Sequence, residues 1–374
     1  MNKSLSFIAL ILILVSCKES NVNSVKLIDN ASFNSTNIKN IELFTLKNSN
    51  GLICQITNYG GRVVSLWTPD RRGNFEDIVL GYGSIEGYLN SNGKYFGALI
   101  GRYSNRIASG SFVLDSVTYN LNKNNNGNHL HGGPKGFHNV VWEPKLINDQ
   151  KLELKYVSEH LEEGYPGKLS VKVVYELSDD NELKIYYEAR TSMPTIVNLT
   201  HHSFFNLKGA GNGTINDHFL QINADYFTPV NKELIPTGEI REVSKSPMDF
   251  SKPKQIGKDL LKPYDQLDFG LGYDHNWVLK SDNKNIKTAA IVEHKGTGRV
   301  MTVLTSEPGL QFYGGNFLNG KDIGKQNKPY NYRSAFCLET QHFPDSPNNI
   351  NFPTVRLDPE QVYNSVCIYK FSTR

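Results

Sequence analysis

Several features that would direct a search for function are missing from this sequence of 374 residues. It has no Cys-x-x-Cys and no His-Glu-x-x-His, so two common zinc-binding signatures are absent. It also lacks Gly-x-Ser-x-Gly, the nucleophile turn of the α/β-hydrolases. The formal net charge is only +3 and no basic block occurs, so no nucleic-acid-binding surface is expected.

Long helical periodicity is scarce, and the glycine-rich stretches do not form nucleotide-binding loops. The segment Gly315 to Asp322 comes near a P-loop, but Asp322 stands where a Ser or Thr would bind magnesium. The run Gly209-Ala-Gly-Asn-Gly213 lacks the spacing of the dinucleotide fingerprint. Neither stretch supports a nucleotide cofactor.

The N-terminus resembles a bacterial lipoprotein signal. Lys3 precedes an apolar run from Phe7 to Val15, which is too short to span a bilayer but suits a signal peptide. It ends in Leu14-Val-Ser-Cys17, which resembles a lipobox. We therefore expect a signal peptide at 1–16, a lipidated Cys17 followed by a flexible tether to residue 36, and a cell-envelope protein facing the periplasm or the exterior. The alternative is an ordinary secretory signal in which Cys17 is incidental.

The other three cysteines lie in apolar, strand-like runs. They are Cys54, Cys337 and Cys367, and three cysteines cannot all pair within one chain. Buried, reduced thiols are expected, although a single pair among them remains open.

Alternation of apolar and polar residues predicts β-strands throughout the rest of the chain. The run 169–177 and the run 183–189 each place apolar residues on one face, and 178–182 has turn composition, so they predict a hairpin. Further alternating runs occur at 112–121, 151–157, 299–305 and 363–371, while Ile85 to Leu89 predicts one short helical turn. Since no repeat and no break in composition appears within 37–374, we expect one all-β domain, a large antiparallel β-sandwich.

Two histidine-containing segments are candidates for chemistry. His129 and His131 lie in Gly127-Asn-His-Leu-His-Gly-Gly133, whose final glycines favour a sharp turn that presents His131. His202 follows His201 among alternating polar and apolar residues that could hold its ring rigidly. A structural role is the alternative for each histidine, and zinc or copper held by His129, His131 and His202 is another.

Glu339 ends the apolar run Ala335-Phe-Cys-Leu. Burial there would raise the pKa of its carboxyl group and make it a usable base, whereas a surface position at a strand end is the competing interpretation.

Four further residues could bind a sugar. Asn105 and Arg106 offer a dense set of hydrogen-bond donors, Asp274 can accept two hydroxyl groups, and Gln311 can donate and accept. The alternative for Asn105 and Arg106 is a charged surface site, the alternative for Asp274 is an Asx turn, and the alternative for Gln311 is a solvent-facing strand residue.

Taken together, these segments resemble the aldose 1-epimerase family. The motifs follow one another in the family's order: Gly-Arg-x-x-Asn-Arg at 101–106, Asn-x-Leu-His-Gly-Gly at 128–133, Asn-Leu-Thr-x-His-Ser-x-Phe-Asn-Leu at 198–207, Asp-His-Asn at 274–276, Pro-Gly-Leu-Gln-Phe-Tyr at 308–313 and Leu-Glu-Thr-Gln-His-Phe-Pro-Asp-Ser-Pro at 338–347.

The resemblance implies a galactose-mutarotase-like β-sandwich that interconverts the α and β anomers of free aldohexoses such as glucose and galactose. It implies His202 as general acid and Glu339 as general base. By ordinary electrostatics, a carboxylate near His202 would raise the pKa of its imidazole. It assigns sugar binding to Asn105, Arg106, His131, Asp274 and Gln311. The chemistry requires no cofactor, and a structural cation stays open. The family often has Asn at position 201, Tyr at 204 and Thr at 314, and none of these departures removes a proposed proton carrier.

Other functions would use these residues differently. A sugar-binding lipoprotein without turnover would not need both His202 and Glu339. A glycoside hydrolase would need two carboxylates, for which Glu339 and Asp345 are candidates. The expected partners are a monosaccharide and, through the lipid anchor alone, a membrane. We expect a monomer and no nucleic acid.

Overall fold

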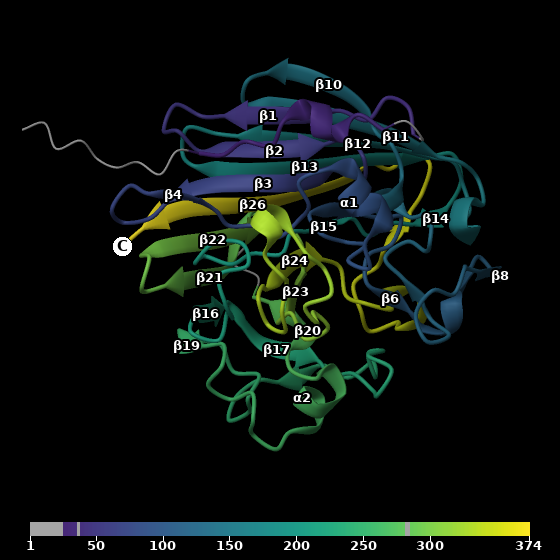
Figure 1. The fold of residues 1–374 in the computed structure, drawn as a ribbon. Coiled ribbons are helices and arrows are strands. Elements are labelled where there is room, and N and C mark those ends of the chain that lie inside the picture. Colours follow the sequence, from purple (N-terminus) through teal and green to yellow (C-terminus); the bar gives the residue numbers. More distant parts are fainter. Residues whose placement is uncertain (1–24, 36–37, 281–284) are drawn as a thin grey trace, which may run out of the picture.

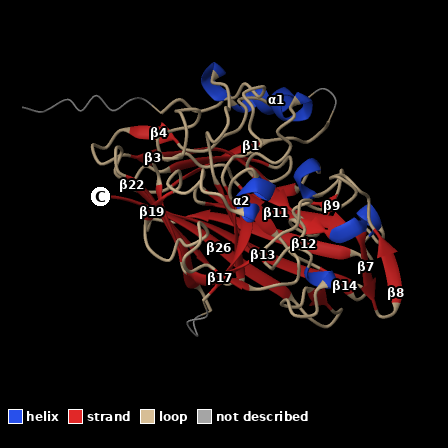
Figure 2. Cartoon of the chain, turned by 90° about the horizontal axis from the view of Figure 1, so that it is seen from below, coloured by secondary structure: helices blue, strands red, loops and turns tan. Residues whose placement is uncertain are grey.

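The structure is a computed structural model that describes residues 25–35, 38–280 and 285–374. Antiparallel strands dominate this part of the chain, and helices are few and short (Figures 1 and 2). The predicted signal peptide and Cys17 lie outside the described residues. In the described ranges, no helix is both long enough and apolar enough to cross a membrane.

One layer of the molecule is a nine-stranded sheet. Its order is β10-β11-β12-β13-β26-β22-β21-β16-β19, and every pairing in it is antiparallel. The strands are β10 (Glu143–Asn148), β11 (Lys151–Ser158), β12 (Leu169–Leu177), β13 (Glu182–Thr191), β16 (Phe219–Ile222), β19 (Lys254–Gln255), β21 (Lys287–His294), β22 (Arg299–Thr305) and β26 (Tyr363–Thr373).

Two smaller sheets pack against the nine-stranded sheet. The four-stranded sheet contains β1 (Leu43–Lys47), β2 (Ile53–Thr57), β3 (Arg62–Pro69) and β4 (Phe75–Asp77) in that order. The five-stranded sheet has the order β18 (Arg241–Glu242), β17 (Ala224–Thr228), β20 (Asp274–Leu279), β23 (Gly309–Tyr313) and β24 (Cys337–Gln341). One hydrophobic core, drawn from Leu46 to Phe371, joins all three sheets. The expected antiparallel β-sandwich is confirmed.

Short strand pairs and helices connect these layers. The pairs are β5 (Ala98–Ile100) with β15 (Thr200–His202), β6 (Arg106–Ile107) with β9 (His129–Leu130), β7 (Ser111–Leu114) with β8 (Val117–Asn120), and β14 (Thr195–Ile196) with β25 (Arg356–Leu357). The α-helices are α1 (Ile85–Asn90) and α2 (Asp265–Gly270). The 3-10 helices are η1 (Asn30–Phe33), η2 (Ala108–Gly110), η3 (Phe137–Asn139), η4 (Glu162–Gly164), η5 (Lys325–Asn327) and η6 (Ser346–Asn348).

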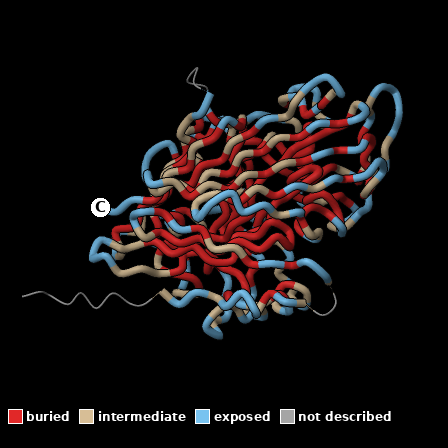
Figure 3. The backbone as a smooth tube through the Cα atoms, turned by 90° about the horizontal axis from the view of Figure 1, so that it is seen from above, coloured by how far each residue is buried: buried red, intermediate tan, exposed pale blue. Residues whose placement is uncertain are grey.

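The predicted hairpin is formed by β12 and β13. Their burial alternates along the chain, with Leu169, Val173 and Leu177 inside, and the same alternation of buried and less buried positions is visible along the strands in Figure 3. The strands join at Ser178, whose N–H donates to the carbonyl oxygen of Glu182. Tyrosine hydroxyls tie the layers together, since Tyr175 donates to the carbonyl of Gly61 and Tyr369 to that of Leu338.

The structure differs from the sequence analysis in three places. The run 112–121 forms two strands, β7 and β8, because Asp115 and Ser116 adopt positive φ and turn the chain. Helix α2 was not expected from the pattern. Residues 25–35 belong to the fold rather than to a free tether: the backbone of Ile28 bonds the side chain of Gln55 in both directions, and Phe33 is buried.

The three described cysteines are buried in strands and unpaired, as expected. Cys54 lies in β2, Cys337 in β24 and Cys367 in β26. Burial raises the pKa of each thiol above its usual value, so these side chains act as small apolar residues of the core.

Candidate active site

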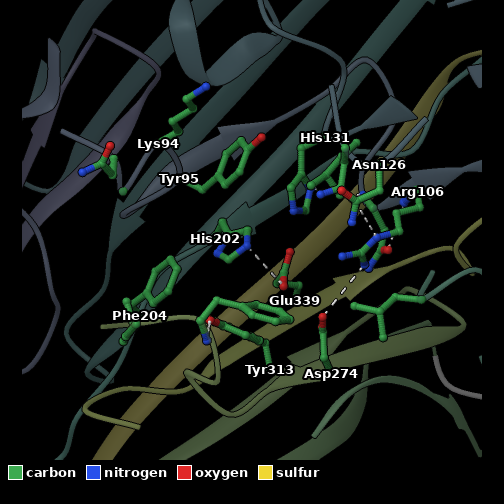
Figure 4. Close-up of a pocket in the computed structure, with 18 of the residues that line it drawn as sticks. Lys94, Tyr95, Arg106, Asn126, His131, His202, Phe204, Asp274, Tyr313 and Glu339 are labelled. Atoms are coloured by element: carbon green, nitrogen blue, oxygen red, sulfur yellow. Dashed lines mark hydrogen bonds and ion pairs between the residues drawn. The ribbon is translucent and has the colours of Figure 1, made fainter. Parts of the chain in front are cut away.

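A cleft of about 530 Å³ opens above the five-stranded sheet and collects most of the predicted site residues. Asn105, Arg106, His131, His202, Asp274 and Glu339 all line it. Figure 4 shows His202 and Glu339 pointing toward each other at its floor, with Arg106 and Asp274 to one side and Tyr95 and His131 above.

Strand register explains why distant segments meet here. In the five-stranded sheet, Asn276 lies opposite Gln311, and Gln311 lies opposite Glu339. Directly paired residues share one face of a sheet, and so do residues two apart on a strand. Asp274, Gln311 and Glu339 therefore share the face that bears the cleft, while Phe312 and Leu338 enter the core.

His202 and Glu339 are held close together from neighbouring elements. His202 Nε2 lies 3.6 Å from Glu339 Oε1, and the two residues are only 5% and 2% exposed. Their strands are tied by Thr200, whose hydroxyl donates to the carbonyl of Thr340 over 2.8 Å. Among the described residues, neither His202 Nδ1 nor Glu339 Oε2 has a hydrogen-bond partner.

Two aromatic rings clamp the His202 imidazole. Phe204 stacks on it at a centroid distance of 4.9 Å and an interplanar angle of 18°, and Tyr95 does so at 5.8 Å and 19°. Tyr95 also meets the edges of His131 and His138 at 4.7 and 4.8 Å. This clamp fixes the plane of the ring, so the direction of its Nε2 toward Glu339 is set before a ligand arrives.

The turn that presents His131 forms as expected. His131 itself has φ 53°, and Gly132 and Gly133 also adopt positive φ. A Cβ at Gly132 would lie 1.8 Å from the carbonyl oxygen of Gly101, so only glycine fits there. The N–H of Asn105 donates to His131 Nδ1 over 3.2 Å, which leaves the proton of the neutral ring on Nε2. His131 thus presents a hydrogen-bond donor.

The proposed three-histidine metal site does not form, because His129 is engaged elsewhere. Its Nδ1 lies 2.6 Å from the carbonyl oxygen of Asn122 and its Nε2 lies 2.7 Å from the hydroxyl of Tyr165. The candidate ligand atoms of His131, His202 and Glu339 lie within 4.8 Å of one another and could surround an ion. The tautomer of His131, however, offers a donor rather than the lone pair that a metal requires.

Arg106 and Asp274 form the polar side of the cleft. Arg106 Nη1 lies 3.9 Å from Asp274 Oδ2, and Arg106 Nε donates to Asn125 over 3.1 Å. Gln311 does not line the cleft; its amide donates to Asp274 Oδ1 over 2.7 Å. Gln311 therefore orients the carboxylate that was expected to share sugar binding with it.

Burial controls the protonation of the site. It raises the pKa of the Glu339 carboxyl well above its usual value, with Asp274 adding to the effect and Arg106 opposing it. It also lowers the pKa of His202 to about 3, where we had expected the adjacent carboxylate to raise it. Both directions favour the neutral pair, a protonated Glu339 beside a neutral His202, over the ion pair, and the two arrangements carry the same net charge.

Asp345, the second carboxylate of the glycosidase alternative, has a structural role. Its Oδ1 accepts the N–H of Ala108 over 2.9 Å and the amide of Asn348 over 2.7 Å. It does not line the cleft, so Glu339 has no second catalytic carboxylate there from that segment.

Sequence reasoning missed Tyr95 and gave no role to Phe204 or Tyr313. Tyr95 lies in an irregular loop between α1 and β5, where no periodicity marks it. Its only sequence signal is an aromatic residue close before the Gly-Arg motif at 101.

The comparisons agree with the geometry. The family model described as "Aldose 1-epimerase" matches residues 42–370. Galactose mutarotase of Bos taurus is 46% identical over 332 residues, covering 89% of this chain and 94% of the bovine one. Aldose 1-epimerase of Escherichia coli (strain K12) is 35% identical over 331 residues, covering 88% and 94%.

Solved structures give the same result. The GalM/aldose epimerase homologue from C. elegans superposes with a TM-score of 0.82 at 28% identity, covering 89% of this chain and 99% of that one. Galactose 1-epimerase from Lactobacillus acidophilus NCFM gives 0.79 at 28% identity, covering 91% and 97%. Sequence, fold and cleft therefore agree: the chain belongs to the aldose 1-epimerase family.

Proposed function

We propose that this protein interconverts the α and β anomers of free aldohexoses such as glucose and galactose. The observation that carries the proposal is the pairing of a buried carboxyl group and an imidazole, Glu339 and His202, whose reactive atoms lie 3.6 Å apart at the floor of a cleft. Two such groups suffice to move the two protons of the reaction.

Ring opening moves two protons, one from the sugar to Glu339 and one from His202 to the sugar. Glu339, as carboxylate, removes the proton from the anomeric hydroxyl O1, and the C1–O1 bond becomes a carbonyl. The C1–O5 bond breaks, its electron pair goes to the ring oxygen, and O5 receives the proton of His202 Nε2. Rotation about C1–C2 and reversal of both transfers close the ring on the other face of the aldehyde, so the enzyme returns unchanged.

The electrostatics of the site favour the open-chain stage. After ring opening, Glu339 is protonated and His202 is neutral, which is the distribution that burial favours in this structure. The active ion pair, by contrast, requires the proton to move from Glu339 to His202. The cost of that transfer is offset when the sugar brings O1–H to the carboxylate and O5 to the imidazole.

The remaining polar residues hold the sugar. Arg106 and Asp274 face the cleft and can bind hydroxyl groups, while the N–H of His131 Nε2 can donate to the reacting oxygen or its neighbour. No step of this scheme uses a metal or an organic cofactor. Exhaustive chelation should therefore leave turnover unchanged, and loss of activity with recovery on adding zinc would contradict the scheme.

Polarimetry on freshly dissolved α-glucose and α-galactose tests the proposal directly. We expect the purified protein to speed the approach to the equilibrium rotation, and the Glu339→Gln and His202→Asn variants to lose most of this effect. A wild-type protein that binds sugar without accelerating mutarotation would instead be a sugar-binding protein.

We also propose that the protein is a monomer anchored to a bacterial envelope membrane by lipid on Cys17. The support is the short apolar run that ends in Leu14-Val-Ser-Cys17. Cys17→Ser should block processing and release the protein from the membrane fraction. An intact mass that shows a mature chain without lipid would contradict the anchor.

A further inference from the structure

A second cavity lies at one end of the sandwich, away from the cleft. Its volume is about 350 Å³, and strands β3, β22 and β26 have their ends there, near the C-terminus (Figure 1). The cavity and the cleft that contains Glu339 and His202 have no lining residue in common. Its side chains therefore take no part in the proposed proton transfers.

Arg299 contributes a buried positive charge to the wall of this cavity. The residue is 4% exposed. Its guanidinium donates to three backbone carbonyl oxygens: Nε to that of Thr68 over 3.3 Å, Nη1 to that of Leu207 over 3.0 Å and Nη2 to that of Asn74 over 3.0 Å. Since a guanidinium has five N–H groups, two of them remain for a further acceptor.

The other four buried arginines of the described chain each have a partner that Arg299 lacks. Arg106 forms an ion pair with a carboxylate. A tyrosine ring lies beside the guanidinium of each of the others, which are Arg62, Arg102 and Arg333. Within the described ranges, Arg299 has no ion-pair partner and no such ring, and burial lowers its pKa although the charges of Asp70 and Glu76 oppose this. A buried charge without a counter-ion is costly, so an anion bound beside Arg299 would stabilise it.

Thr68 adds a buried hydroxyl group to the same cavity. The residue is 2% exposed, and its Oγ1 has no hydrogen-bond partner in the part of the chain that the structure describes. An unsatisfied buried hydroxyl costs about 1–3 kcal/mol, which a ligand oxygen that accepts its proton would recover. The hydroxyl groups of Ser372 and Thr373 and the amide of Asn181 are further donors at the cavity.

The composition of the wall selects the charge of a ligand. None of the described residues that line the cavity is acidic, and its polar side chains include one cation and several hydrogen-bond donors. The forked donors of a guanidinium match the paired oxygens of a phosphate or carboxylate group.

We propose that Arg299 and Thr68 form a binding site for a small oxyanion, with the guanidinium as its counter-ion and the hydroxyl as a hydrogen-bond donor. The site goes beyond the proposed function and does not rest on it, because it uses none of the residues of the cleft. Since the unfolded chain has no such site, a bound oxyanion should stabilise the folded protein.

The test follows the melting temperature of the purified protein as sodium phosphate or sodium acetate is added, with sodium chloride at matched ionic strength as the reference. Thr68→Val keeps the shape of the side chain and removes the hydroxyl, and Arg299→Lys keeps the charge and removes the forked donors. Thr195→Val is the matched control, because Thr195 is also fully buried, its hydroxyl also lacks a partner among the described residues, and it does not line the cavity. Phosphate stabilises folded proteins in general, so the quantity compared is the saturable part of the shift in each variant.

We expect at least one of the two oxyanions to give a saturable rise in melting temperature that chloride does not give. Phosphate alone would identify a tetrahedral ligand group, and acetate alone a carboxylate. Thr68→Val and Arg299→Lys should each raise the apparent Kd by about tenfold or more, whereas Thr195→Val should keep the wild-type value. A wild-type protein that neither oxyanion stabilises in a saturable way would overturn the site, and so would an unchanged Kd in Thr68→Val or in Arg299→Lys.

Discussion

At the scale of single residues, the site depends on two groups whose burial shifts their pKa values in opposite directions. Glu339 is buried beside Asp274, which makes its ionised form costly, and His202 is buried beneath two aromatic rings, which makes its charged form costly. Both shifts disfavour the ion pair in the free site. A sugar that supplies hydroxyl groups to both partners restores the polar surroundings that burial removed.

Replacing Glu339 by Gln separates chemistry from binding. The amide keeps the shape but cannot accept a proton, so kcat should fall by about 10²–10⁴ while sugar still binds. Arg106→Ala and Asp274→Ala should instead raise KM, because those side chains hold hydroxyl groups before and during the reaction. Rates and binding measured on the same preparations check this, and near-wild-type turnover by Glu339→Gln would contradict the role of the base.

The Glu339→Gln variant should be more stable than the wild type near neutral pH. Because the folded-state pKa of Glu339 is raised, the folded protein holds this proton more tightly than the unfolded chain does. That contribution to stability is present at low pH and is lost as the pH rises above the usual glutamate value. The gain in melting temperature from Glu339→Gln should therefore be present at pH 7 and vanish near pH 4. Because the active form carries its proton on His202 rather than on Glu339, the basic limb of the kcat/KM profile should follow the raised pKa of Glu339 and lie above the usual glutamate value.

Tyr95 can affect the reaction through its ring, which contacts His202, and through its hydroxyl, which can bind sugar. Two variants separate these two effects. Tyr95→Phe keeps the contacts with His131, His138 and His202, so kcat should be retained, with KM raised two- to tenfold at most if one hydrogen bond to sugar, worth roughly 0.5–1.5 kcal/mol, is lost. Tyr95→Leu removes the clamp, and kcat should fall by about tenfold or more. Steady-state kinetics decide the matter. Equal behaviour of the two variants would show that the ring does not position His202.

At the scale of secondary structure elements, the sequence predicted the strands in which apolar and polar residues alternate and the segments that carry motifs of polar residues. The hairpin of β12 and β13 follows from strict alternation, because a side-chain period of two leaves only one face for the core. His202 and Glu339 could be proposed because each lies in a motif of polar residues within an apolar run. Their closeness could not be worked out from either segment, since it arises from the pairing of β5 with β15 and from the bond between Thr200 and Thr340.

Other features of the site could not be predicted from the sequence, for physical reasons. Tyr95 lies in a loop, where no period constrains the sequence. Gln311 was expected to bind sugar, but its hydrogen bond to Asp274 could not be predicted, because it depends on the cross-strand register of β20 and β23. The pKa of His202 was expected to rise because the charge of Glu339 was considered and the depth of burial was not.

The hydrogen bond between Thr200 and Thr340 offers a test of how His202 and Glu339 are held together. Thr200→Val keeps the shape but leaves the Thr340 carbonyl without this donor, which should cost about 1–3 kcal/mol of unfolding free energy. It should also lower kcat, because β15 carries His202 and β24 carries Glu339. Thr305→Val is the control: Thr305 is buried and its hydroxyl donates to the carbonyl of Val366 over the same 2.8 Å, away from the cleft. Chemical denaturation and kinetics of both variants provide the readout, and equal effects on kcat would contradict the positioning role.

At the scale of the whole molecule, several of the described histidines are buried, and burial disfavours their charged form. Burial lowers the pKa of His138, His201, His202 and His275 to about 3 each, against an ordinary value of 6.5. The unfolded chain takes up these protons near pH 6, whereas the folded protein does not. The stability that they contribute is therefore complete at neutral pH and is lost progressively as the pH falls below 6.5.

This difference in proton uptake between the folded and unfolded states predicts that the protein loses stability in mild acid. Below pH 6.5, each of the four histidines should lower the free energy of unfolding by about 1.4 kcal/mol per pH unit, which amounts to several kcal/mol by pH 5 and is comparable to the whole stability of a typical domain. His201 allows a specific check because it lies between Tyr175 and Tyr369, away from the cleft lining, and because both of its ring nitrogens lack a hydrogen-bond partner among the described residues. Urea denaturation of His201→Asn between pH 7 and 5 should show one fewer proton taken up on unfolding than in the wild type, whatever the change in absolute stability. A wild-type protein whose unfolding free energy is constant over this range would show that these imidazoles titrate in the folded state as they do in water.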